Sequence, residues 1–317
     1  MRSLIATIAL ALFAAAAPVY AQTYPTRTIT LIVPFPPGGS TDVAARILAE
    51  RMAPNLGQPV IVEDLGGAGG SIAVGRLARA TPDGYTIDIG QWDTHVGSII
   101  YNLNYDLQTD FAPIGLVSLN PQLLVARKAL PADDLSALIA WMKAHPGEAK
   151  FVNQNASAQV SGLLLEKLTG TQVLFVPYRG AGPAMTDLIS GQVDLLVVQA
   201  AAALPQVRAG TIKALANLSP QRSASVPDIP TSDESGVRGL YMSGWFGLFA
   251  PKATPPDIIA KLNSAFRQAL AAPETRARLD ALGAESKVGT PEDLDKMLAA
   301  ERARWTAVVK AANIKME

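Results

Sequence analysis

The sequence predicts an α/β protein of two lobes that two crossover strands join. Short apolar runs alternate with segments of helical spacing, which is typical of βαβ units and a mainly parallel sheet. A strand, a Pro/Gly-rich turn and a helix occur once in each half, at PFPPGGSTD and again at PYRGAGP. Two apolar extended pieces, near 117–123 and 243–248, are placed to carry the chain from one half to the other and back.

The first half is organised around Thr28–Met52. Its apolar run Ile29–Val33 predicts a buried strand, and the spacing of Thr41–Met52 predicts an amphipathic helix after the turn. A second strand, helix and strand are expected, in that order, at Val60–Glu63, Ser71–Ala80 and Tyr85–Ile89. The extended segment Ala112–Arg127 then leads into the second half.

The second half repeats the alternation. Helices are expected at Leu135–Ala144, Ser161–Leu168 and Ala184–Ser190, and strands at Lys150–Val152, Val173–Val176 and Val193–Val198. The chain returns through Gly244–Ala250 and ends in three helices, at Pro256–Ala271, Glu274–Leu282 and Leu294–Ala312. We therefore expect one lobe from 22–120 and 248–317, and the other from 121–247.

The first 21 residues have the pattern of a secretory signal peptide. A short basic start precedes an apolar run over Leu4–Ala17, and Val19-Tyr20-Ala21 fits a small-residue cleavage site. The run is too short to span a bilayer. We expect an exported mature chain that begins at Gln22.

Composition limits the function classes. Without Arg2, 26 basic residues stand against 27 acidic ones, so the mature net charge is near −1. Nucleic-acid binders are normally basic, so we expect no nucleic-acid partner. The chain has no cysteine, which excludes a disulfide scaffold, and two histidines, which disfavours a zinc site.

The two turns suggest anion binding. Ligands of open α/β sheets bind at the carboxyl ends of the strands, where both turns are expected. Unpaired amides and the positive dipole end make a helix N-terminus an anion site, and Gly38 and Gly39 would let a ligand approach the backbone. The alternative is a turn that only connects, with Ser40, Thr41 or Asp42 as an ordinary N-cap.

Several side chains near the turns allow two interpretations each. Arg179 either pairs with an anion or is a solvated surface residue. Tyr178 and Phe35 either line a pocket or pack beneath their loops. Trp92 and Trp245 are either core or pocket wall, and we expect at least one of them in the core.

Neither nucleotide nor catalytic motifs are present. The glycine run Gly66–Gly70 has no G-x-G-x-x-G pattern, and the P-loop lysine is missing, so we expect no cofactor. No G-x-S-x-G elbow occurs. His95 follows a strand on the expected ligand side, whereas His145 stands at a helix end. We therefore expect neither catalytic residues nor a metal.

Four segments together resemble the Bug family, the periplasmic solute receptors of tripartite tricarboxylate transporters. They are PFPPGGSTDVAARILAERM, VEDLGGAGGSIAVGRLARATPDGYT, VPYRGAGPAMTDLISGQVDLL and WFGLFAPKATP, in the family's order. The resemblance implies a two-lobed periplasmic binding protein fold of type II-like topology. It also implies hinged closure on one small organic carboxylate.

The resemblance also implies the binding residues. Carboxylate contacts are expected from the first loop (Phe35, Gly39, Ser40, Thr41, Asp42) and from the second loop (Tyr178, Arg179, Gly180, Ala181, Gly182). The helix after the crossing commonly begins in the family with a serine cluster followed by His-Leu. Ser157 and Ser161 fit this pattern here, and Gly162 stands where histidine is usual.

The sequence thus predicts a monomeric periplasmic receptor that delivers a mono- or dicarboxylate to a membrane transporter. Two alternatives remain open at this stage. One is an exported hydrolase or isomerase that uses Asp42, His95 or Ser40 in the same cleft. The other is a ligand sensor that docks onto a membrane kinase.

Overall fold

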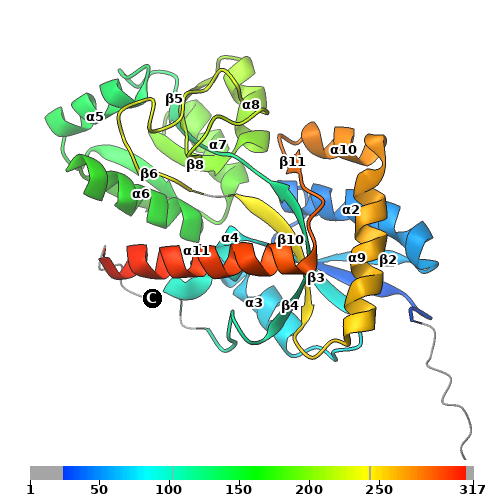
Figure 1. The fold of residues 1–317 in the computed structure, drawn as a ribbon. Coiled ribbons are helices and arrows are strands. Elements are labelled where there is room, and N and C mark those ends of the chain that lie inside the picture. Colours follow the sequence, from blue (N-terminus) through cyan, green and yellow to red (C-terminus); the bar gives the residue numbers. More distant parts are fainter. Residues whose placement is uncertain (1–23, 102, 243, 312–317) are drawn as a thin grey trace, which may run out of the picture.

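Two β-sheets organise the chain, and each has its own helices (Figure 1). The computed structural model describes residues 24–101, 103–242 and 244–311. The expected signal peptide, residues 1–21, lies outside the described residues. In Figure 1 the elements drawn in green form one half of the molecule, and the blue and orange elements form the other.

The first sheet has six strands in the order β11-β4-β10-β3-β1-β2. Strands β1, β2 and β3 are parallel, whereas β10 is antiparallel to both β3 and β4. Strand β1 lies between two parallel neighbours and is buried on both faces, which explains its continuous apolar sequence. The bounds are β1 Ile29–Val33, β2 Val60–Asp64, β3 Thr86–Gln91, β4 Phe111–Leu119, β10 Trp245–Pro251 and β11 Glu285–Ser286.

The helices of this half come from both ends of the chain. Their bounds are α2 Ser40–Leu56, η1 Ala68–Gly70, α3 Ser71–Ala78, α4 Trp92–His95, η2 Gly97–Ile100, α9 Pro256–Ala271, α10 Pro273–Asp280 and α11 Pro291–Ala311. Helices α2 and α9 pack together on the sheet, and Leu48 and Phe266 belong to one buried cluster there. The N-terminal and C-terminal parts of the chain therefore share one hydrophobic core.

The second sheet has five strands in the order β7-β6-β8-β5-β9. Strands β6, β7 and β8 run parallel, and β5 pairs antiparallel with β8 and β9. The strands are β5 Gln122–Arg127, β6 Ala149–Asn153, β7 Val173–Pro177, β8 Leu195–Gln199 and β9 Ile212–Asn217. The helices are α5 Leu135–Ala144, α6 Ala156–Thr169, α7 Ala181–Ser190 and α8 Ala200–Arg208.

The chain passes between the sheets twice, from β4 to β5 and from β9 to β10. The two passages lie side by side, because Asn120 donates its backbone N–H to the Gly244 carbonyl at 2.7 Å. A Cβ at residue 244 would lie 2.1 Å from the Asn120 carbonyl oxygen, so only glycine fits. The lobe boundaries at 120/121 and 247/248 stay a prediction.

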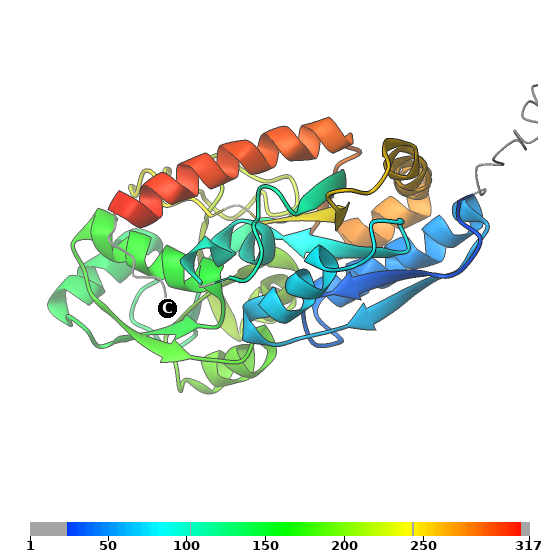
Figure 2. The ribbon, with the colours of Figure 1, turned by 90° about the horizontal axis from the view of Figure 1, so that it is seen from below.

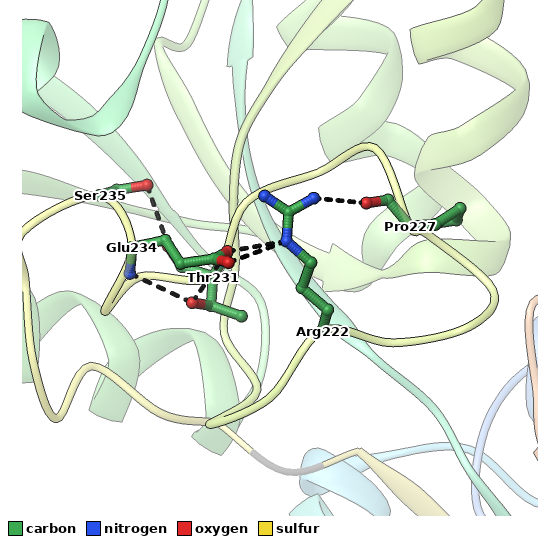
Figure 3. Close-up of polar contacts among 5 residues, drawn as sticks. All are labelled: Arg222, Pro227, Thr231, Glu234 and Ser235. Atoms are coloured by element: carbon green, nitrogen blue, oxygen red, sulfur yellow. Dashed lines mark hydrogen bonds and ion pairs between the residues drawn. The ribbon is translucent and has the colours of Figure 1, made fainter.

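The return passage from β9 includes a long polar segment that its own side chains hold together (Figure 3). The Arg222 Nε donates to both carboxylate oxygens of Glu234, at 2.9 and 3.0 Å, and its Nη1 donates to the Pro227 carbonyl at 2.6 Å. Glu234 also accepts the Thr231 backbone N–H at 2.8 Å. The pKa of Glu234 is lowered, mainly by the Arg222 hydrogen bond.

Helix α11 extends from the first sheet along the molecule toward the second half, as Figures 1 and 2 both show. Leu294 and Leu298 are buried in its first turns, and Trp305 is buried near its end. The Trp305 ring meets Trp92 edge-on at 5.0 Å, and the indole N–H groups of both donate to Glu301. Trp92 and Trp245 are both core residues, so the expectation for at least one of them is confirmed.

The predicted helices and strands are observed with the predicted types, but several helices begin earlier than predicted. Helix α6 begins at Ala156 rather than Ser161, because the Asn155 side chain caps it by accepting the Ala158 N–H at 3.0 Å. Helix α7 begins at Ala181 rather than Ala184, since a proline in the first turn removes no helical hydrogen bond. Helices α4 and α8 and strand β11 had no predicted counterpart.

Candidate functional site

The carboxyl edges of the two sheets face each other. In the first sheet, helices α2, α3 and α4 follow the parallel strands β1, β2 and β3. In the second, α6, α7 and α8 follow β6, β7 and β8. Two hydrogen bonds, Ser40 to Gln199 and Ser157 to Asp93, join these edges and so place helix N-termini of both sheets at one interface.

A glycine is the N-cap of each helix that follows a Pro/Gly-rich turn. Gly39 is the N-cap of α2 and Gly180 the N-cap of α7, and neither helix has a side-chain cap. Gly180 has a φ of 142°, and a Cβ there or at Gly182 would meet no atom within 4 Å. No side chain of a described residue therefore caps the backbone N–H groups at either helix start. The alternative of Ser40, Thr41 or Asp42 as N-cap of α2 is wrong.

Both carboxylate oxygens of Asp42 contact groups close to it in the chain. Its Oδ2 accepts the Gly38 backbone N–H at 2.8 Å, and its Oδ1 lies 2.6 Å from the Arg46 Nε. Arg46 in turn donates to Asp64 at 2.7 Å. Burial and the Asp42 charge together raise the pKa of Asp64. The carboxylate of Asp42 thus fixes the path of the first loop.

Ser40 and Thr41 reach beyond their own helix. The Ser40 hydroxyl donates to Gln199 Oε1 at 2.7 Å, at the end of β8 in the second sheet. The buried Thr41 hydroxyl donates to Gln91 Oε1 at 3.2 Å, at the end of β3. The first turn of α2 is therefore joined to both sheets by side-chain hydrogen bonds.

Asp93 was not predicted from the sequence. Its Oδ1 accepts the Ser157 backbone N–H at 2.7 Å, and its Oδ2 accepts the Gln91 amide N–H at 3.3 Å. Burial raises the pKa of Asp93, although the Ser157 hydrogen bonds oppose this shift. The available signal was its position directly after a strand of the parallel sheet, where ligand-side residues gather.

Ser157 and Ser161 lie one turn apart on α6, and both are buried. The Ser157 hydroxyl donates to Asn155 Oδ1 at 3.1 Å, whereas the Ser161 hydroxyl has no hydrogen-bond partner. Gly162 faces the core, because a Cβ there would lie 2.5 Å from the Phe175 ring. Any side chain at 162, including the histidine usual in the family, would require Phe175 to move.

The second loop presents one anchored and one exposed side chain. Tyr178 donates its backbone N–H to the Asn153 carbonyl at 2.8 Å and its hydroxyl to Asp187 at 2.5 Å. That second bond raises the pKa of Tyr178 to about 12. Arg179 is exposed, Ala181 packs partly on the second core, and Phe35 packs partly on the first.

The predicted residues of the two loops form two separate groups. Over the described parts of the chain, no hydrogen bond or ion pair joins 35–42 directly to 178–182. The bonds that join the two carboxyl edges are instead Ser40 to Gln199 and Ser157 to Asp93, and Gln91 connects Asp93 with the first turn of α2.

His95 is not a ligand-facing base. Its ring is fully buried and stacks on Phe249 at 4.1 Å. Burial lowers its pKa to about 3 and raises that of Asp88, whose carboxylate lies 3.7 Å away. His145 stacks on Trp141 at the end of α5, far along the chain. A catalytic role for His95 at the interface is therefore wrong.

Within residues 24–101, 103–242 and 244–311, no group of His, Asp and Glu side chains has the arrangement of a metal site. In the same part of the chain, no helix is both long and apolar enough to cross a membrane. A surface hollow between α8 and α10, lined in part by Arg208, Asp280 and Glu285, contains none of the predicted site residues.

Comparison with known proteins finds close relatives. Residues 44–314 match the family described as "Tripartite tricarboxylate transporter family receptor". The chain is similar to the protein BugT of Bordetella pertussis, with 39% identity over 307 residues that cover 95% of this chain and 94% of BugT.

Two solved structures have the same architecture. The periplasmic binding protein BugD superposes with a TM-score of 0.84 at 36% identity, covering 93% of this chain and 100% of BugD. MatC from Rhodopseudomonas palustris with bound malate gives a TM-score of 0.84 at 38% identity, covering 90% and 100%. The predicted two-lobed periplasmic binding protein fold with two crossover strands is confirmed.

Proposed function

Because the chain belongs to the tripartite tricarboxylate transporter receptor family, we propose that it captures a small organic carboxylate between its two lobes. It delivers this ligand to the membrane subunits of a tripartite transporter. Members of the family are solute-binding receptors rather than enzymes, and MatC holds malate. The mechanism is closure of the lobes on the ligand, a shift of population rather than chemistry.

One observation carries the choice of a carboxylate. Helices α2 and α7 follow strands of different sheets, and both begin at glycine N-caps without a side-chain cap. Their amides are free to donate to one anion. Each charge-assisted hydrogen bond contributes about 1.5–3 kcal/mol, and each dipole end about 0.3–1 kcal/mol on an exposed surface.

The geometry supports a set of site residues for this carboxylate. The carboxylate accepts hydrogen bonds from the Gly39–Asp42 and Gly180–Gly182 backbones. The side chains of Phe35 and Tyr178 line the ligand site, and the exposed Arg179 adds a positive charge at its edge. Ser157 and Ser161 lie on α6, on the ligand's far side.

The wider setting is part of the same proposal. Cleavage after Ala21 releases a mature chain that begins at Gln22 in the periplasm, where the relative BugD is described. The lobes comprise 22–120 with 248–317, and 121–247. The mature chain acts as a monomer, so sedimentation should give about 31 kDa, which is 33.3 kDa less the 21 residues of the signal peptide.

A thermal-shift screen tests the function. Organic mono- and dicarboxylates, amino acids and matched neutral amides are added to the mature protein at rising concentration. A ligand that binds only the native state stabilises it by about 2.7 kcal/mol at 100 times its Kd. We expect at least one carboxylate to raise the melting temperature while its fully amidated analogue does not. A screen in which no acid moves the transition would contradict the proposal.

A further inference from the structure

A carboxylate of the protein itself occupies the amino end of α6. Asp93 Oδ1 accepts the Ser157 backbone N–H at 2.7 Å, and Asp93 is 4% exposed. Asp93 follows β3 of the first sheet, whereas α6 follows β6 of the second. This helix N-terminus, unlike those of α2 and α7, therefore already holds an anion that comes from the opposite lobe.

Asp93 is also connected to the proposed carboxylate clamp. Gln91 donates to Asp93 Oδ2 and accepts from the hydroxyl of Thr41, which stands in the first turn of α2. Two hydrogen bonds thus separate Asp93 from the α2 N-terminus. Among the described residues, no lysine or arginine forms an ion pair with Asp93, so only hydrogen bonds and the α6 N-terminus stabilise a negative charge on its carboxyl group.

A second buried group on α6 lacks a partner. Ser161 stands one turn after Ser157 on the same face of the helix, and it is 2% exposed. Its hydroxyl forms no hydrogen bond. A buried hydroxyl without a partner is costly, so a ligand group that bonds to it is favoured.

We propose that Asp93 determines the charge of the ligand. The receptor selects acids with a single carboxylate whose far end is neutral or cationic, and it rejects a second carboxylate. Like charges in a partly desolvated site repel strongly, and at the α6 N-terminus the Ser157 and Ala158 N–H groups already donate to Asp93 and Asn155. An amide, hydroxyl or ammonium at the far end can donate a hydrogen bond to Asp93 instead. This inference rests on the proposed function.

Two series of matched ligands test it by calorimetry. The four-carbon series is succinate, succinamate and 4-aminobutanoate, and the six-carbon series is adipate, adipamate and 6-aminohexanoate. In at least one series, the wild type should bind the monoamide or the amine at least about tenfold more tightly than the diacid. Asp93→Asn should raise the ratio of diacid to monoamide affinity at least about tenfold.

Control variants separate charge from structure. Asp228→Asn removes an exposed carboxylate that forms neither a hydrogen bond nor an ion pair with the described residues, and it should leave the ratio unchanged. Asp93→Ser keeps a small oxygen acceptor for the Ser157 N–H and should shift the ratio as Asp93→Asn does. A merely structural role for Asp93 would lower the affinity for all ligands together and leave the ratio unchanged.

The possible failures are distinguishable. If the wild type prefers the diacids, or if Asp93→Asn leaves the ratio unchanged, the inference is overturned and the proposed function stands. If no acid in either series or in the wider thermal-shift screen binds, the proposed function fails and the inference fails with it.

Discussion

At the scale of single residues, the main feature of the proposed site is backbone N–H groups that no side chain of the described residues covers. The positive φ at residue 180 favours glycine, whereas Gly182 has ordinary helical geometry and open space where a Cβ would stand. Glycine at 182 is therefore not required by folding. Its value lies in leaving the α7 N-terminus accessible to a ligand.

Gly182→Val tests this role directly. The valine side chain would project where the carboxylate binds, so affinity should fall at least about tenfold, or 1.4 kcal/mol. The ligand-free free energy of unfolding should change by less than about 0.5 kcal/mol, as for an exposed substitution. Calorimetry and urea denaturation measure the two quantities.

Thr186→Val is the matched control, because residue 186 is exposed one turn further along the same helix. It should bind ligand like the wild type. Unchanged binding by Gly182→Val would show that α7 does not hold the carboxylate.

Ser40 and Gln199 provide a second test, since their 2.7 Å hydrogen bond joins the two lobes. If closure forms this bond, Ser40→Ala should weaken ligand binding by about 0.5–1.5 kcal/mol. Gln199→Leu should have a similar effect, and the double variant should cost less than the sum. Additive effects on affinity would mean that the contact does not contribute to closure.

The sequence indicated which loop residues lie on the ligand side, but it did not indicate their hydrogen-bond partners. The pattern PFPPGGSTD indicated Ser40 and Thr41 as ligand-side residues, but nothing local indicated that they bond to Gln199 and Gln91. Asp42 has the residue type of an N-cap, yet it accepts the Gly38 N–H instead. Such choices depend on contacts between segments that are distant in sequence.

At the scale of elements, the buried ring of His95, which packs against Gly90 of β3 and Phe249 of β10, links stability to pH. Its folded-state pKa of about 3 lies below the ordinary value of 6.5. The unfolded chain therefore takes up a proton that the folded chain excludes, so stability falls as pH falls from 6.5 toward 3. The slope from this group is about 1.4 kcal/mol per pH unit.

His95→Gln removes this contribution. Between pH 6.5 and 4.5 the variant should lose about 2 kcal/mol less unfolding free energy than the wild type, as measured by urea denaturation. His145→Gln, at the end of α5, is the control and should keep the wild-type loss. Equal losses in all three proteins would refute the assignment.

The order and type of most elements followed from apolar periodicity, as β1 and α9 illustrate. Helix starts were less predictable. The proline at 183 suggested a late start for α7, although first-turn positions tolerate proline. That difference matters for the site, because it makes Gly180 the N-cap and brings Ala181 and Gly182 into the first turn.

At the scale of the whole molecule, two adjacent passages join two sheets whose carboxyl edges meet. The Asn120–Gly244 contact keeps the passages together, and glycine is required there. Side-chain bonds across the interface, from Ser40 and Asp93, are at the opposing helix starts. Such an arrangement suits opening and closing about a short hinge.

The central claim is that the Gly39–Asp42 and Gly180–Gly182 backbones hold one carboxylate from opposite lobes. A crystal structure with the tightest-binding acid from the screen tests it most directly. We expect carboxylate oxygens within about 3.2 Å of backbone nitrogens of both segments, directly or through one water. A carboxylate bound by one segment alone, or elsewhere in the molecule, would contradict the account.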